Sequence, residues 1–195
     1  MAVITVSRQL GSLGTEVAQQ AANRLGYRIV EREVINQAAL RAGAPEVALA
    51  MIDELHLLGL CPTEEACQAY IQALGVVMEE LAAGGNIVIV GRAGQVILAN
   101  RPDTLHVRLI APLQIRIERI AQRRGISLQA ARAQVTASDR CRKKFIKHFY
   151  NHDLDDPDQY DLIINTARFT FEATVNLICQ TLLNGFRSLT RQPNT

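Results

Sequence analysis

Short runs of apolar, mostly β-branched residues alternate along the chain with longer stretches of amphipathic character. The short runs predict five strands, at Val3–Val6, Tyr27–Val30, Asn86–Val90, Leu105–Ile110 and Tyr160–Asn165. The third and fifth contain NIVIV and YDLIIN, nearly unbroken apolar runs that are typical of strands buried on both faces.

The stretches between the strands predict helices at Glu16–Leu25, Glu33–Ala42, Thr63–Ala83, Leu113–Arg124, Ser127–Tyr150 and Phe171–Phe186. Several carry end signals: Gly26 and Gly125 follow predicted helices as C-caps, and Ser127 is a good N-cap. Strands that alternate with helices indicate an α/β fold with a mostly parallel sheet. Such sheets bind ligands at the carboxyl ends of their strands.

The chain has 195 residues, 48% of them hydrophobic, which suits one α/β domain over residues 1–195. No apolar run reaches the roughly 20 residues of a membrane span. Met1 leads straight into a strand without a basic leader, so a cytoplasmic protein is expected. Four cysteines without CxxC spacing favour free thiols over a zinc site.

The loop after the first predicted strand has the layout of a phosphate-binding loop. Ser7-Arg-Gln-Leu-Gly-Ser-Leu-Gly-Thr15 joins a β-branched run to a helix, and backbone N–H groups at such a junction hold anions. The signature G-x-x-x-x-G-K-[ST] fits poorly, because Gly14 stands at the lysine position when Thr15 ends the motif. Shifting the register by one residue also supplies no lysine. An ordinary strand-to-helix corner is the alternative.

Charge is unevenly distributed although the net charge is only +2. Residues 106–150 hold eleven Lys/Arg against two Asp/Glu, and residues 31–80 hold nine Asp/Glu against two Lys/Arg. The basic segment is compatible with a polyphosphate ligand, with nucleic acid or with a solvated helical face. Aromatic residues are sparse there, which does not favour nucleic acid. The aspartates at 153–161 are interpreted as a turn before the last strand rather than a metal cluster.

Six stretches, in this order, resemble the cytidylate kinase-like family of P-loop proteins over about residues 3–178. They read SRQLGSLGTEVA, LGYRIVEREVI, NIVIVGRAGQVIL, LHVRLIAPLQIRIERI, SDRCRKKF and DPDQYDLIINT. The family's loop often reads S-R-x-x-G-S-x-G, already without lysine. This chain departs from its relatives at Leu13, where they tend to have glycine, and at Ala93-Gly94, where their order is reversed. Val90 replaces the aspartate of true cytidylate kinases, so cytidine selectivity is not implied.

The resemblance implies a P-loop NTPase-like, five-stranded parallel sheet flanked by helices. The core would comprise residues 1–32 and 84–195, with a helical insertion at about 33–83 and an arginine-rich lid within about 119–150. It also implies ATP and Mg²⁺ as cofactors and a nucleoside monophosphate or similar phosphorylated acceptor.

Phosphoryl transfer requires positioning and charge neutralisation, which gives each candidate residue a role. Backbone N–H groups would cradle the donor phosphates along Gly11, Ser12, Leu13, Gly14 and Thr15. The Thr15 hydroxyl would reach Mg²⁺ or act simply as an N-cap.

The candidate arginines follow from position and from the resemblance. Arg92, just past a buried strand, would bind the acceptor phosphate or pair with the acidic insertion. Arg119 and Arg123 resemble lid arginines. Arg142, in Asp139-x-x-Arg142, would stabilise the transferring charge or form a helical pair with Asp139.

Two further arginines complete the set. Arg8 is the candidate that would replace the missing lysine. Arg116 shares a helical face with Arg119 and Arg123 and is interpreted as solvated.

Three hypotheses follow. The first is an ATP-dependent kinase acting on a small phosphorylated acceptor. The second is a catalytically impaired nucleotide-binding module of the same fold, which Leu13 and the absent lysine favour and which leaves a homodimer open. The third, nucleic-acid binding through residues 123–147, is the least favoured, and no membrane partner is expected.

Overall fold

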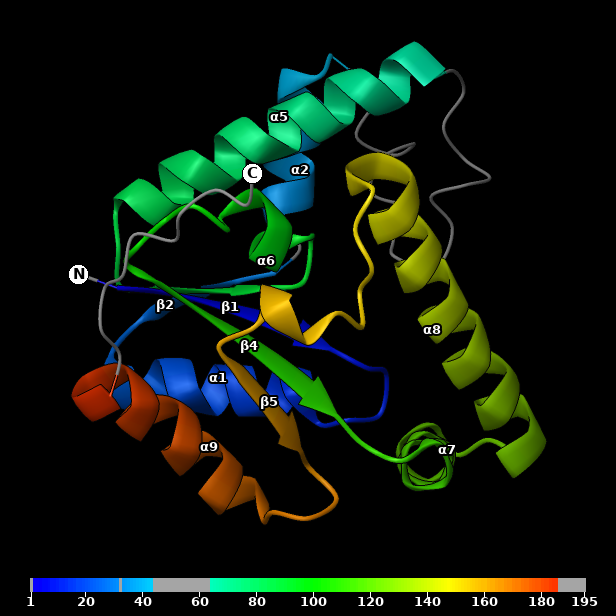
Figure 1. The fold of residues 1–195 in the computed structure, drawn as a ribbon. Coiled ribbons are helices and arrows are strands. Elements are labelled where there is room, and N and C mark those ends of the chain that lie inside the picture. The colour runs from blue at the N-terminus through cyan, green and yellow to red at the C-terminus, as the bar shows by residue number, and fades with distance from the viewer. Residues whose placement is uncertain (1, 32, 44–63, 186–195) are drawn as a thin grey trace.

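The five strands form one parallel sheet in the computed structural model, which describes residues 2–31, 33–43 and 64–185. They are β1 (Val3–Arg8), β2 (Arg28–Val30), β3 (Ile87–Val90), β4 (Thr104–Ile110) and β5 (Leu162–Asn165). Their order is β2-β3-β1-β4-β5, and every pairing is parallel (Figure 1). β1 and β3 therefore lie side by side, and their following loops meet at one edge.

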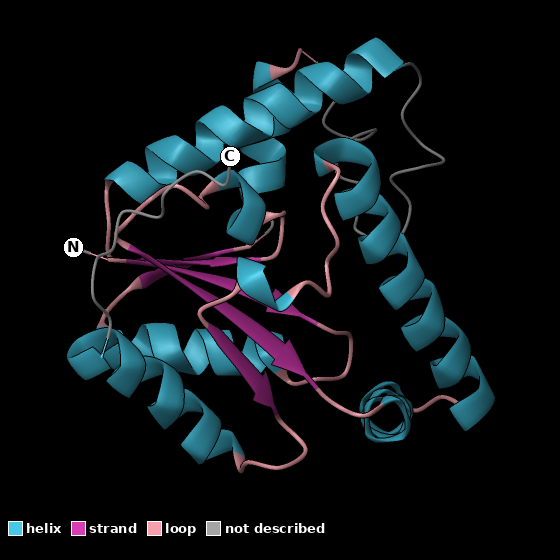
Figure 2. Ribbon diagram, viewed as in Figure 1, coloured by secondary structure: helices cyan, strands magenta, loops and turns pink. Residues whose placement is uncertain are grey.

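Helices cover both faces of the sheet (Figure 2). The described helices are α1 (Gly14–Leu25), α2 (Glu33–Arg41), α5 (Glu64–Ala83), α6 (Gly94–Ile97), α7 (Leu113–Arg124), α8 (Leu128–Tyr150) and α9 (Phe171–Gln180). A 3₁₀ turn, Pro157–Gln159, precedes β5, and a π turn, Thr181–Gly185, follows α9. α1 and α9 lie on one face and α2, α5 and α6 on the other. α7 and α8 stand beyond the carboxyl ends of the strands.

Alternation along the strands divides the core into two parts. In β3, Ile87 and Ile89 pack in the cluster beneath α5, whereas Val88 and Val90 pack in the cluster beneath α1 and α9. All four are almost completely buried, as the unbroken apolar run predicts. A third cluster joins α7 to α8.

The end signals read from the sequence are confirmed. Gly26 and Gly125 follow α1 and α7 in the left-handed conformation, at φ 67° and 62°. The Ser127 hydroxyl accepts a hydrogen bond from Ala130 N at 3.2 Å and caps α8. β1 extends two residues beyond its predicted end, because its register with β4 continues through Arg8. The last helix ends earlier than predicted, at Gln180, and continues as the π turn.

The structure bears only partly on two expectations from the sequence, the helical insertion and the free thiols. α2 and α5, packed together, are the described portion of the predicted insertion, and residues 44–63 lie outside the described residues. Cys67 on α5 is disulfide-bonded, which corrects the expectation of free thiols, while Cys141 and Cys179 form no disulfide. Among the described helices, none is long and apolar enough to cross a membrane.

Candidate active site at the β1 and β3 loops

The loop between β1 and α1 is wound into a tight turn. Ser12 donates to the Gln9 carbonyl from both its backbone N, at 3.1 Å, and its hydroxyl, at 2.8 Å. Gly11 has φ 84°, a conformation that favours glycine. Leu13 is the N-cap of α1, at φ 61°, and its side chain makes no capping hydrogen bond. The first N–H groups of the helix are therefore not occupied by the side chain of the cap.

Close approaches explain the two glycines of the loop. A Cβ at Gly14 would overlap the Cβ of Arg8 and lie 2.9 Å from its Cγ, and a Cβ at Gly11 would lie 2.7 Å from the Arg116 carbonyl oxygen. The stem of Arg8 therefore occupies the space that any side chain at Gly14 would need. This packing gives a steric reason for the absent lysine.

The loop after β3 contains a second residue with the left-handed backbone conformation of Leu13. Ala93 caps α6 at φ 59°, again a residue other than glycine in the left-handed region. Gly94 follows it and packs on β1, where an added Cβ would lie 3.0 Å from the Thr5 Cγ2. These are the two departures from the family pattern, and both put a side chain at a backbone conformation that favours glycine.

A cavity of about 190 Å³ opens above the loop, and Leu13, Gly14 and Thr15 line it. Its charged lining consists of five arginines against two glutamates: Arg8, Arg92, Arg123, Arg124, Arg142, Glu16 and Glu31. The excess of guanidinium groups around backbone N–H donors suits a multiply charged anion such as a polyphosphate.

Arg8 and Arg142 both line this cavity and are in contact with each other. The Arg142 Nη1 donates to the Arg8 carbonyl oxygen at 2.7 Å, so α8 is tied to the end of β1. The Arg8 guanidinium is largely buried and pairs with Glu31 at 2.7 Å. The predicted helical pair between Asp139 and Arg142 is wrong, because the Asp139 carboxylate binds another arginine.

That arginine is Arg116, and the interpretation of its face as solvated is wrong. Its side chain is 5% exposed and holds Asp139 through two bonds, of 3.0 and 2.8 Å. Its Nε donates to the Ala111 carbonyl at 2.9 Å, and Nη1 reaches the Leu10 carbonyl at 3.4 Å. The arginine therefore joins α8 to the phosphate loop, a role that helical spacing could not show.

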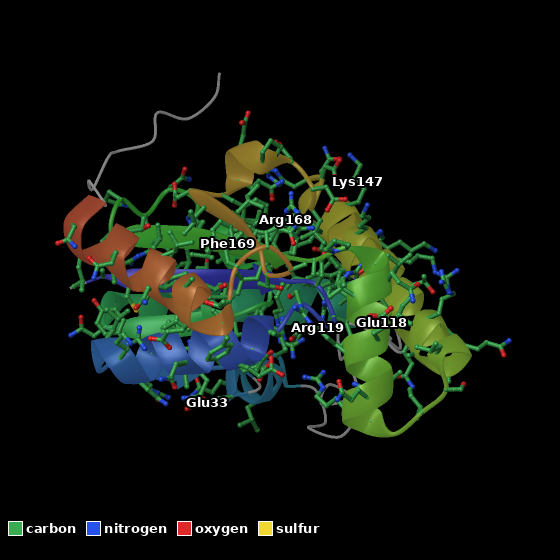
Figure 3. All side chains as sticks on the ribbon, turned by 90° about the horizontal axis from the view of Figure 1, so that it is seen from below. Glu33, Glu118, Arg119, Lys147, Arg168 and Phe169 are labelled. Atoms are coloured by element: carbon green, nitrogen blue, oxygen red, sulfur yellow. The ribbon has the colours of Figure 1, made fainter. Side chains whose placement is uncertain are left out.

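Arg119 binds the loop from below, between α7 and the start of α1 (Figure 3). It donates to the Gly11 carbonyl at 3.3 Å, and to the hydroxyl and carbonyl of Thr166 at 3.1 and 3.0 Å. The Thr166 hydroxyl in turn donates to the Ser12 carbonyl at 2.8 Å. In this structure Arg119 positions the loop through its carbonyls and does not line the cavity above it.

Two further candidates, Arg123 and Thr15, line the same cavity. Arg123 pairs with Glu16 at 2.5 Å, and both side chains are about half exposed. Thr15 is exposed, one residue inside α1, and its alternative role as N-cap is wrong because Leu13 holds that position.

The aspartates before β5 form turns, as interpreted from the sequence. Asp153 accepts from Asp155 N at 3.0 Å, and Asp156 accepts from Asp158 N at 3.0 Å. Asp155 pairs with Arg108 and Lys143, and this carboxylate raises the pKa of the Lys143 amine. Within the described ranges, no group of three His, Cys, Asp or Glu residues is placed to hold a metal ion.

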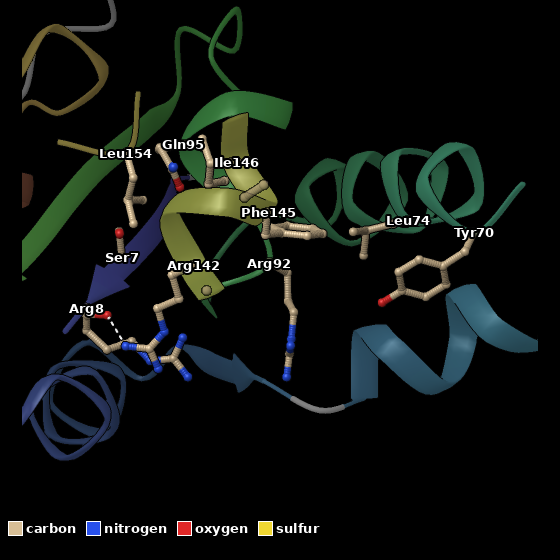
Figure 4. A pocket seen from close by; sticks show the side chains of 12 residues that line it. Ser7, Arg8, Tyr70, Leu74, Arg92, Gln95, Arg142, Phe145, Ile146 and Leu154 are labelled. Carbon is tan, nitrogen blue, oxygen red and sulfur yellow. Dashed lines mark hydrogen bonds between the residues drawn. The ribbon is translucent and has the colours of Figure 1, made fainter. Parts of the chain in front are cut away.

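A second, apolar pocket adjoins the first, and sequence reasoning missed it. Buried side chains from α5, α8 and the loop before β5 form its walls (Figure 4): Tyr70, Leu74, Phe145, Ile146 and Leu154. Burial raises the pKa of Tyr70 to about 12, and the nearby positive charge of Arg92 opposes that rise. The cavity measures about 30 Å³, room for about two waters, so a larger occupant requires its walls to move apart.

Three arginines lie at the junction of the two pockets. Arg8, Arg92 and Arg142 line both of them, and Figure 4 shows all three along one side of the apolar pocket. Arg92 is 7% exposed and has φ 58° in the β3 loop. Its pairing with the acidic insertion stays a prediction. The arrangement places one polar and one apolar compartment on either side of a positively charged wall.

Comparison with curated proteins gives matches of different extent. A uronate isomerase of Corynebacterium glutamicum is 35% identical over 105 residues, 54% of this chain and 20% of that protein. The cytidylate kinase of Methanocaldococcus jannaschii is 37% identical over 108 residues, 54% of this chain and 60% of that protein. In both, the match spans less than two thirds of the relative. The cytidylate kinase of Ignicoccus hospitalis is 31% identical over 183 residues, 94% of this chain and 100% of that protein.

Solved structures support the fold. An uncharacterized protein from Eubacterium ventriosum matches with a TM-score of 0.73 at 18% identity, over 94% of this chain and 99% of that one. A shikimate kinase from Acinetobacter baumannii, solved with shikimate, matches with a TM-score of 0.54 at 16% identity, over 94% and 93%. The sequence profile of the cytidylate kinase-like family matches residues 3–168. The chain therefore belongs to the cytidylate kinase-like family.

Proposed function

We propose that this chain is a nucleotide-dependent phosphotransferase that uses ATP and Mg²⁺ and phosphorylates a nucleoside monophosphate or a similar small phosphorylated acceptor. The observation that carries the proposal is the junction of two pockets at Arg8, Arg92 and Arg142. A phosphoryl group passing between two anionic substrates requires positive charge at the point where they meet.

The donor would occupy the polar cavity above the phosphate loop. Backbone N–H groups at the start of α1 would hold its phosphates, and Arg123 would contact it, exchanging its bond to Glu16. The exposed Thr15 hydroxyl, a hard oxygen ligand on the cavity wall, suits Mg²⁺, which retains waters and phosphate oxygens as its other ligands. Bound there, the ion would neutralise phosphate charge.

The acceptor would occupy the apolar pocket with its phosphate on the arginine wall. Arg92 and Arg142 each offer a planar fork that pairs two phosphate oxygens. Arg8 adds charge beside the loop from the position that Gly14 leaves to it. Arg119 and Arg116 are positioning residues, because they bind the loop's carbonyls.

The direct test is a phosphoryl-transfer assay with ATP, Mg²⁺ and the four ribonucleoside monophosphates, read by ³¹P NMR. We expect diphosphate product from at least one acceptor. Substitution Arg142→Ala should lower kcat by about 10²-fold or more, as loss of a positioned charge donor does. Arg132→Ala, at an exposed position on the same helix, is the matched control.

A catalytically impaired binding module is the second candidate, and Leu13 favours it. This side chain lines the cavity where the phosphates would lie. Micromolar binding of ATP without any transfer would support this alternative. Appearance of transfer in Leu13→Gly would then identify the side chain as the obstacle, whereas turnover by the unaltered protein would exclude the alternative.

A further inference from the structure

One buried amide in the apolar pocket has an unused hydrogen-bond donor. Gln95 on α6 is 3% exposed and lines the pocket. Its Nε2 is fully buried and has no hydrogen-bond partner in the part of the chain that the structure describes. A buried N–H without a partner destabilises the fold, so such a group in a pocket indicates a partner supplied by a ligand.

The walls around Gln95 restrict what that ligand can be. Figure 4 shows Gln95 near Ile146 and Leu154, with Phe145 beyond them. The Phe145 ring contacts the rings of Phe149 and Tyr150, at centroid distances of 5.2 and 5.9 Å, so this wall is aromatic and apolar. A sugar with many hydroxyls would leave most of them unpaired against such walls, whereas a planar ring presents apolar faces to them.

We propose that Gln95 is a specificity-determining residue of the acceptor pocket. Its carboxamide N–H binds an acceptor atom, a carbonyl oxygen or ring nitrogen, on the edge of a planar nitrogenous base. The phosphate of the same molecule lies on the arginine wall of Arg8, Arg92 and Arg142. The proposal rests on the proposed function, and it assigns the base-reading contact to one named side chain.

The experiment measures binding by calorimetry for the four ribonucleoside monophosphates and for ribose 5-phosphate, which carries the phosphate without a base. In Gln95→Leu we expect the affinity for the preferred nucleotide to fall about 10- to 100-fold, the loss typical of an unmade hydrogen bond in a site built for it. Affinity for ribose 5-phosphate should stay within about twofold. In Gln95→Glu, which has no N–H to donate when ionised, the order of preference among the bases should change.

Thermal unfolding without ligand separates this role from a structural one. Because Gln95→Leu removes an unpaired buried donor, its Tm should equal or exceed that of the unaltered protein. The control is Gln159→Leu, a buried glutamine outside the pocket whose Nε2 is bonded to the Asp153 carbonyl and whose Oε1 has no partner within the described residues. That variant should keep the order of preference among the bases.

Two results would overturn the proposal, and they differ in what else they overturn. If the unaltered protein binds a nucleotide and Gln95→Leu weakens all ligands equally, or none, Gln95 does not read the base and the proposed function stands. If the unaltered protein binds none of the four nucleotides, the proposed acceptor class falls as well.

Discussion

At the scale of single residues, the phosphate loop is shaped by contacts too close for a side chain. Gly14 lies against the stem of Arg8, and Gly11 against the backbone of Arg116. A lysine at position 14 would overlap Arg8 as it is placed here, so under the proposed function the charge would come from the neighbouring strand end. Leu13 and Ala93, in contrast, hold conformations that a glycine would adopt at less cost.

Substitution Gly14→Ala should therefore destabilise the protein by about 1 to 3 kcal/mol, because the new methyl group overlaps the Arg8 stem rather than a flexible side-chain end. Urea unfolding measures the change. Gly75→Ala on α5 is the matched control, since open space surrounds that position. It should be neutral or stabilising by up to about 1 kcal/mol, because alanine favours a helix interior. Equal losses in both variants would contradict the packing explanation.

At the scale of elements, hydrogen bonds to carbonyls tie α7, α8 and the end of β5 to the phosphate loop. Arg116 and Asp139 join α7 to α8, Arg119 and Thr166 join α7 to the β5 end, and Arg142 joins α8 to β1. The loop is thus held by three elements that are distant from it in sequence. Their side chains bind its carbonyls, each from a different part of the sequence.

Thr166→Val keeps the side-chain shape and removes the hydroxyl that joins Arg119 to the Ser12 carbonyl. We expect the KM for ATP to rise about tenfold, with little change in the KM for the acceptor, because Ser12 lies in the part of the loop that would hold the donor under the proposed function. Steady-state kinetics with each substrate varied in turn would show this. Thr174→Val, a buried threonine on α9 that bonds its own helix, should leave both constants unchanged.

Asp139→Asn tests the joint between α7 and α8. Because the Arg116 side chain stays buried without its carboxylate, the free energy of unfolding should fall by about 2 to 4 kcal/mol. Chemical denaturation measures it, and Asp158→Asn, at an exposed site, should change stability by less than about 0.5 kcal/mol. A loss below about 1 kcal/mol in Asp139→Asn would show that α8 is held mainly by its apolar contacts.

At the scale of the whole molecule, buried tyrosines make the stability of the fold depend on pH. Burial raises the pKa of Tyr70 to about 12, and burial also raises the pKa of Tyr150. The unfolded phenol loses its proton near pH 10, whereas the folded one retains it. Between these values the folded state binds more protons, so stability is complete below about pH 10 and falls as the pH rises towards 12.

Tyr70→Phe should flatten that alkaline loss. The difference in unfolding free energy between this variant and the unaltered protein should change by about 2 to 3 kcal/mol between pH 9 and pH 12. Urea unfolding across this pH range measures it. A difference independent of pH would mean that Tyr70 ionises as easily in the folded protein as in the unfolded chain.

Local patterns were enough to predict the elements. The strand runs, the span of α7 and the caps at Ser127, Gly26 and Gly125 depend on residues close in sequence, so the chain by itself determined an α/β fold and where its loops begin. The presence of Arg8 and Arg92 on the cavity lining also followed, since Arg8 ends β1 and Arg92 lies just past the neighbouring strand β3.

Only the tertiary structure decided which partner each arginine has. Asp139 stands three residues from Arg142, yet its carboxylate binds Arg116 on α7 through two hydrogen bonds. The burial of Gln95 and the apolar walls beside it were likewise decided by packing between α5, α6 and α8. Spacing along one element cannot encode contacts between elements, since those depend on how the finished surfaces fit together.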